Sequence, residues 1–173
     1  MVDVIENDPK RIAEFHPTVR AFPDQVTLQE LFEAQVRQRP LQSAVRCDHD
    51  HVWGTSTFTY EQLNEKANQL ARRLRDDGVR PGDIVAIFAE RSFAMLIGIY
   101  GVLKAGGAYL PLSPEDPPER IAYIVADAGA RVVLVHGATA LKAPAGVPTI
   151  DLEQPDAYAG PTTNPPPVNR PDV

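Results

Sequence analysis

Lys104 and the glycines after it are the residues of this sequence that come nearest to a phosphate-binding loop. They lie in the segment LKAGGAYLPLSPEDPPER, which runs from Leu103 to Arg120. A phosphate loop usually has the N-terminus of a helix directly behind its glycines. Here the order is reversed, because the lysine and glycines end a predicted helix, and a helix C-terminus attracts a cation and repels phosphate. We therefore interpret Gly106 and Gly107 as a left-handed cap and a close approach of helix and strand.

The segment CDHDH places metal-ligand residue types at alternate positions. Cys47, His49 and His51 would share one face if this segment is extended. Zinc sites usually draw their ligands from two separated pairs, and the remaining histidines, His16 and His136, are isolated. A polar hairpin arm beside a turn explains the same residues, and we favour it over a metal site.

The sequence contains no recognisable motif for nucleophilic catalysis. No G-x-S-x-G is present, and Ser92 and Ser113 are more simply interpreted as a cap and a turn residue. Glu90 and Arg91 follow a predicted strand, where open α/β sheets bind ligands, but a solvated or ion-paired loop explains them better. From the residues alone we assign no catalytic, cofactor-binding or metal-binding residue.

The elements that would position these residues alternate between strand and helix in the second half of the chain. Short apolar runs predict strands at 84–88, 108–112 and 131–135, and helical periodicity predicts helices over about 93–105 and 117–128. We expect the strands at 84–88 and 108–112 to be buried. Strand–helix alternation with short connections predicts an α/β fold built from βαβ crossovers on a mainly parallel sheet.

Local signals predict how the elements begin. Thr27 and Glu30 have capping-box spacing, and segment 59–62 repeats this spacing ahead of a second apolar stripe. Residues 44–58 resemble a short hairpin. Asp116 is expected to cap the helix that follows it.

Length and composition favour one α/β domain flanked by less regular segments. The chain has 173 residues, 43% of them hydrophobic and 23% charged. We divide it into an N-terminal linker or arm at 1–26, an ordered region at 27–155 and a Pro-rich extended linker at 156–173. The ordered region includes one further short strand near 148–152.

Charge and hydropathy argue against several partner classes. A net charge of -6 argues against nucleic acid and against an anionic membrane. The longest uncharged apolar stretch, 94–103, is far shorter than the roughly 18 residues of a membrane span. The N-terminus lacks the apolar core of a signal peptide, and Cys47, the single cysteine, cannot form a disulfide within the chain. We therefore expect a soluble cytoplasmic protein.

Two motifs resemble a known family. FTYEQLN, residues 58–64, resembles the first core motif of the adenylation domains of nonribosomal peptide synthetases, within the adenylate-forming AMP-binding superfamily. LKAGGAYLPL, residues 103–112, resembles their second core motif. The similarity extends in consistent order and spacing from about Thr27 to Val135. The chain therefore resembles the N-terminal part of such a domain. This part is the first subdomain of the large domain of an adenylate-forming enzyme, and we expect the chain to hold an incomplete version of the fold.

The resemblance implies a reaction for the parent enzyme. Adenylation domains use ATP and Mg²⁺ to convert an amino acid to an aminoacyl adenylate, release pyrophosphate, and pass the acyl group to the phosphopantetheine thiol of a carrier protein. The phosphate loop, acidic nucleotide-binding motifs and C-terminal lysine of that family are not found in this sequence. NPPPVNRPDV, residues 164–173, resembles the stretch just before the phosphate loop. We therefore expect the chain alone to be inactive, with no cofactor of its own.

The resemblance also implies partners and contains two departures. The implied partners are the remainder of the adenylation domain, a carrier-protein domain and an upstream condensation domain, because RIAEFHPTVRAFP resembles a condensation–adenylation linker. Since the sequence starts at Met1, we expect the chain either to open a synthetase subunit or to be cut from a larger one. Ser113 stands where peptide synthetases usually have Asp. The segment CDHDHVWGTST is longer than usual, and Trp53 within it either packs on the domain or marks a contact surface.

Two alternatives to an amino-acid-activating fragment stay open. The chain could be the equivalent piece of an acyl-CoA ligase, since that branch is looser at the position of Ser113. It could also be a truncated or split non-catalytic module that docks on a complementary chain, because a parallel sheet interrupted early leaves an unpaired edge. An independent Rossmann-type nucleotide binder is excluded by the lack of a G-x-G-x-x-G after a strand.

Overall fold

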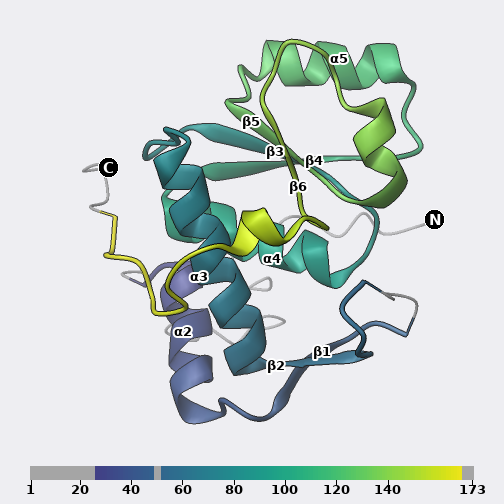
Figure 1. Ribbon diagram of the computed structural model, residues 1–173. Helices are drawn as coiled ribbons and strands as arrows, with labels where there is room; N and C mark the ends of the chain where they lie inside the picture. The colour runs from purple at the N-terminus through teal and green to yellow at the C-terminus, as the bar shows by residue number, and fades with distance from the viewer. Residues whose placement is uncertain (1–25, 49–51, 169–173) are drawn as a thin grey trace, which may run out of the picture.

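The computed structural model describes residues 26–48 and 52–168, and its helices cover both faces of a central sheet (Figure 1). Helices α3 and α4 pack on one face of the sheet and α5 packs on the other. This three-layer arrangement confirms the predicted α/β fold. The elements in chain order are α2 (Leu28–Gln38), β1 (Ser43–Arg46), β2 (Thr57–Thr59), α3 (Tyr60–Asp76), β3 (Ile84–Phe88), α4 (Phe93–Ala105), β4 (Ala108–Leu112), α5 (Pro118–Asp127), β5 (Val132–Val135), η1 (Gly137–Lys142), β6 (Thr149–Asp151) and η2 (Pro155–Tyr158).

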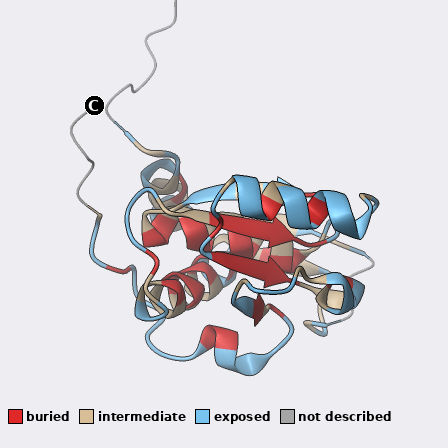
Figure 2. Ribbon diagram, turned by 90° about the horizontal axis from the view of Figure 1, so that it is seen from above, coloured by how far each residue is buried: buried red, intermediate tan, exposed pale blue. Residues whose placement is uncertain are grey.

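Within the described residues, the main sheet has four parallel strands in the order β4-β3-β5-β6. Alternate residues of the central strand β3 face opposite layers: Val85 and Ile87 pack toward α3 and α4, whereas Ala86 and Phe88 pack toward α5. Figure 2 shows the buried strands between the outer helices. The continuous apolar run at 84–88 is thus explained by cover on both faces, as predicted.

The expectation that the strand at 108–112 is buried was wrong. Ala108 is exposed, and Tyr109 retains 41% of its accessible surface. The reason lies in the strand order, because the crossover through α4 places β4 outside β3, while the crossover through α5 returns to the other side of β3. Among the strands of residues 26–48 and 52–168, β4 therefore has one neighbour and forms an edge of the sheet.

Side-chain caps begin three helices as the sequence predicted, and a fourth cap was wrong. Both capping boxes form, and the Ser92 hydroxyl accepts a hydrogen bond from the Met95 N–H. Asp116, however, does not cap α5. Pro117 is the N-cap and makes no side-chain cap bond. Because Pro117 precedes Pro118, its backbone is restricted to an extended conformation, and the helix begins one residue later than expected.

The first hairpin and the last described segment lie on the α3 side of the domain. Strands β1 and β2 pair antiparallel, which confirms the predicted hairpin. After η2, residues 160–168 run without helix or strand along α3 (yellow in Figure 1), and we call this segment the tail. Tyr158, just before the tail, is buried, as is Pro165 within it. No helix among the described residues is long and apolar enough to cross a membrane.

Candidate functional site

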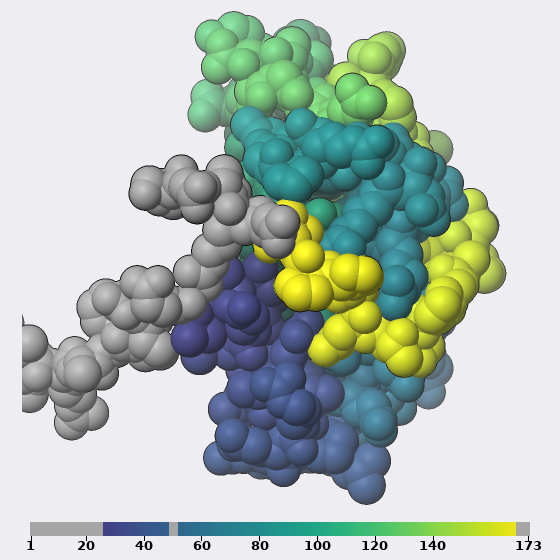
Figure 3. Space-filling view, turned by 90° about the vertical axis from the view of Figure 1, so that its left-hand side faces the viewer, coloured from purple at the N-terminus to yellow at the C-terminus, as the bar shows by residue number. Residues whose placement is uncertain are grey.

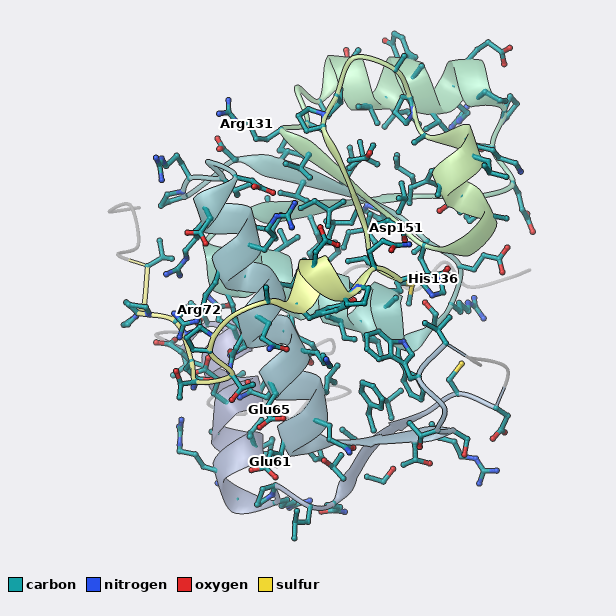
Figure 4. All side chains as sticks on the ribbon, in the orientation of Figure 1. Glu61, Glu65, Arg72, Arg131, His136 and Asp151 are labelled. Atoms are coloured by element: carbon teal, nitrogen blue, oxygen red, sulfur yellow. The ribbon has the colours of Figure 1, made fainter. Side chains whose placement is uncertain are left out.

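The carboxyl ends of the parallel strands bring several polar residues to one edge of the sheet. Glu90 and Arg91 follow β3 and are exposed, and Ser113 follows β4 and is also exposed. His136 follows β5, and its Nε2 lies 3.8 Å from the Glu153 carboxylate with no hydrogen-bond partner. Figure 4 shows His136 near Asp151 at this edge.

The serine hydroxyls at this edge are engaged in local structure. Ser92 Oγ accepts from the Met95 N–H and donates to the Glu90 carbonyl, while Ser113 Oγ accepts from the Glu115 N–H at 3.3 Å. Both serines therefore act as the cap and turn residue that the sequence predicted. Neither is hydrogen-bonded to His136, the histidine that lies within the described part of the chain.

The candidate metal segment is only partly described. Cys47 is a free, half-buried thiol, and Asp48 accepts a hydrogen bond from Arg46. His49 and His51 lie outside the described residues. Within residues 26–48 and 52–168 no group of three His, Cys, Asp or Glu side chains could hold a metal ion.

Trp53, beside that segment, packs on the domain. Its ring makes edge contacts with Phe58 and Tyr158, with centroids 5.5 and 5.3 Å apart. Lys66 Nζ lies 4.9 Å from the centroid of the Tyr158 ring. These contacts explain Trp53 by packing against the core on the α3 side.

Lys104 is buried in the last turn of α4. Its side chain is 1% exposed, and its Nζ donates a hydrogen bond to the Glu33 carboxylate of α2. Burial lowers the pKa of Lys104 from its ordinary value of 10.5, and the bond to Glu33 opposes that shift. Gly106 follows with φ +97° as the left-handed C-cap, so the segment ends a helix as predicted. The lysine thus neutralises a protein carboxylate at the negative end of a helix dipole.

A buried polar cluster surrounds Lys104. Asn64 and Asn68, one turn apart on α3, each donate through Nδ2 to Asn164 Oδ1 of the tail, at 3.0 and 2.9 Å. Lys104 Nζ lies 3.4 Å from the same oxygen. Asn68 is fully buried and donates also to the Thr162 carbonyl at 2.6 Å.

An open cavity of about 380 Å³ lies beside this cluster. The start of α2, the end of α4 and the proline run of the tail form its walls. Figure 3 shows the tail (yellow) crossing this side of the molecule next to α2 (purple). Glu30, Glu33 and Lys104 are its charged lining residues. Because the one cation among the described lining residues is already paired with Glu33, those residues offer no free positive charge to an anion.

This polar cluster was not predicted from the sequence. Asn64 and Asn68 are spaced four residues apart beside the apolar stripe of α3, and that spacing was the available signal. Their acceptor Asn164 is a hundred positions from Asn64, so no local pattern could connect them.

Comparison with known families decides what this domain is part of. Residues 32–170 match the family described as AMP-binding enzyme. The chain belongs to the AMP-binding enzyme family. In this chain, Lys104 and its glycines form the connection between helix α4 and strand β4.

Relatives within the AMP-binding family are peptide synthetases. Gramicidin S synthase 2 of Brevibacillus brevis is 41% identical over 171 residues, which cover 98% of this chain and 4% of the synthase. Bacitracin synthase 1 of Bacillus licheniformis is 44% identical over 156 residues, or 89% of this chain and 3% of the synthase. The chain thus spans only a small part of these relatives.

Solved structures agree with this placement. The nonribosomal peptide synthetase FmoA3, in its α-methyl-L-serine-AMP-bound form, matches with a TM-score of 0.78 and 34% identity, covering 91% of this chain and 17% of that one. The N-terminal subdomain of NpsA from Klebsiella oxytoca matches with a TM-score of 0.68 at 22% identity, which shows the shared fold. The chain corresponds to the N-terminal portion of an adenylation domain of the AMP-binding family.

Proposed function

We propose that this chain serves in the activation of an amino acid, as the N-terminal portion of an adenylation domain in nonribosomal peptide biosynthesis. The reaction of the whole enzyme would convert ATP and an amino acid to an aminoacyl adenylate and pyrophosphate, and then load a carrier protein. The observation that supports this proposal most directly is the similarity to peptide synthetases over nearly the whole chain. Because those relatives are synthetases, they favour an amino acid over the acyl-CoA ligase substrate that Ser113 left open.

ATP and Mg²⁺ are proposed to bind residues other than those described. Lys104 is committed to Glu33, and the described residues hold no group of three metal-ligating side chains. The residues of the structure therefore do not fit a nucleotide phosphate with its metal ion, and we assign no reaction step to them. Their proposed role is to form the α/β layer on which the rest of the domain is built.

The proposed partners follow from the same assignment. They are the remainder of the adenylation domain, a phosphopantetheine-bearing carrier domain and a condensation domain upstream. A cytoplasmic location is proposed with them, and the single free thiol of Cys47 fits a reducing compartment.

The isolated chain is predicted to show no amino-acid-dependent ATP–pyrophosphate exchange. The reason is that Lys104 is paired with Glu33 and that the described residues hold no group of three metal-ligating side chains. The measurement uses the purified chain, ATP, Mg²⁺ and each of the amino acids in turn. Exchange above the no-enzyme background would contradict the proposal that this portion is non-catalytic by itself.

A non-catalytic docking module is the second candidate, and strand β4 is the observation that favours it. No strand of the described residues pairs with the outer side of β4, so its backbone N–H and C=O groups form a sheet edge, where Tyr109 is 41% exposed. Such a module is expected to self-associate when it lacks its complement, as seen by light scattering during size-exclusion chromatography. A chain that stays monomeric and monodisperse over a hundredfold range of concentration would remove the motive for this candidate.

A further inference from the structure

One side-chain oxygen of the tail serves three donors of the domain, in addition to the bond that Asn68 Nδ2 donates to the Thr162 carbonyl at 2.6 Å. Asn164 Oδ1 accepts from Asn64 at 3.0 Å and from Asn68 at 2.9 Å, and Lys104 Nζ lies 3.4 Å away. All three donors belong to buried residues of α3 and α4. Asn164 itself is an exposed residue, so its amide oxygen is directed inward while the rest of the residue meets solvent.

We propose that Asn164 is a latch residue, which fixes the tail on α3 and α4 and so sets where the following chain leaves the domain. It is a positioning residue that acts through the path of the tail. A buried donor that loses its partner is costly, whereas an exposed donor exchanges its partner for water at little cost. Because their donors are buried, these bonds are expected to stabilise the position of the tail more than the same number of exposed hydrogen bonds would.

The seat of the tail extends to Gly106. A Cβ built at this glycine would lie 2.9 Å from Val168 Cγ1, so Val168 packs directly over the helix cap. The tail is thus in contact with the end of α4 on both sides of its proline run, at Asn164 and at Val168. The lysine and the first glycine of the LKAGG motif both contribute to this seat.

Arg72 of α3 also binds the tail, through exposed hydrogen bonds that we call the surface clamp. Its guanidinium donates to the carbonyl of Pro161 at 3.3 Å, to that of Thr163 at 2.8 Å and to that of Asn164 at 3.4 Å. Figure 4 shows Arg72 beside the tail. These bonds are exposed, so water competes for them. We therefore expect Asn164 to contribute more to the ordering of the tail than Arg72 does.

The test is ¹⁵N relaxation of the full chain, read at the backbone amides of Thr162, Thr163, residue 164 and Val168. In the native chain we expect backbone order parameters of about 0.85 at these amides, which is typical of rigid backbone. In Asn164→Ala they are expected to fall below about 0.6. Asn164→Asp is expected to keep the native values, because a carboxylate accepts the same bonds and attracts Lys104. Thr162→Ala, which keeps the Thr162 carbonyl, is the matched control and should also keep them.

The outcome distinguishes the buried latch from the surface clamp. Arg72→Ala is expected to lower the order parameters less than Asn164→Ala does. A tail that stays rigid in Asn164→Ala, or that is released only by Arg72→Ala, would overturn the proposal. Unchanged amide shifts in β3 and β5 show that a variant is folded, and Asn164→Ser, too short to reach both amides, replaces Asn164→Ala if those shifts move.

Discussion

At the scale of single residues, the ion pair between Lys104 and Glu33 explains a lysine that resembled a phosphate ligand. Its two members are unequally buried, at 1% and 20% side-chain exposure. Breaking a buried pair from one side leaves an uncompensated charge, and the cost is greater when the charge left behind is the more deeply buried of the two. The pair therefore predicts different outcomes for its two deletions.

Glu33→Ala is expected to lower the free energy of unfolding by about 3 kcal/mol, and Lys104→Met by a smaller amount. The first variant strands a cation in the interior, and the second leaves a carboxylate that water can reach. Urea unfolding followed by circular dichroism gives both values. Equal losses in the two variants would show that the burial of Lys104 is not what makes the pair costly to break.

The pH dependence of stability provides an independent check on the same lysine. Because burial lowers the pKa of folded Lys104 below 10.5, the unfolded chain binds more protons in the interval between the two values. The native protein is therefore expected to gain stability relative to Lys104→Met as the pH rises through the lowered value toward 10.5, and to gain nothing further above it. A stability difference that is flat across this interval would contradict the burial effect.

At the scale of elements, the contact between α3 and α4 depends on a glycine. A Cβ at Gly101 would lie 2.8 Å from Leu70 Cδ2 and 3.0 Å from its Cγ, and Leu70 is fully buried. A Cβ at Gly98, one turn earlier in α4, would be 3.4 Å or more from its neighbours. The two helical glycines thus differ in how closely another side chain approaches them.

Gly101→Ala is expected to destabilise the domain by about 1–3 kcal/mol through overpacking against Leu70. Gly98→Ala is the matched control, and it should be neutral or gain up to about 1 kcal/mol from helix propensity. Thermal unfolding of both variants measures the difference. The helix contact would be looser than described if both substitutions had the same effect.

Elements whose signals are local were predictable from the sequence. The capping box at Thr27 needs only its own turn, and the run at 84–88 carries its burial in its composition. The prediction that Asp116 caps α5 was wrong because the following Pro117–Pro118 pair sets where the helix starts. The prediction that β4 is buried was wrong because strand order is a property of the whole sheet. The role of Asn164 was not predicted because its partners are far away in sequence.

At the scale of the whole molecule, the chain is a three-layer unit with an open sheet edge at β4 and a tail directed along α3. Its relatives extend well beyond it, since the FmoA3 chain is covered to only 17%. The proposed function therefore depends on whether this unit can stand in for its counterpart in a complete enzyme. That question has a direct test.

The most direct test is ATP–pyrophosphate exchange by a chimera in which residues 27–168 replace the matching segment of a bacitracin synthase 1 adenylation domain. The chimera is predicted to keep the amino-acid preference of the recipient at a rate within about tenfold of it, a barrier change below about 1.4 kcal/mol. The control chimera carries the gramicidin S synthase 2 segment. An active control beside a folded but inactive chimera bearing residues 27–168 would contradict the assignment of this chain to an amino-acid-activating adenylation domain.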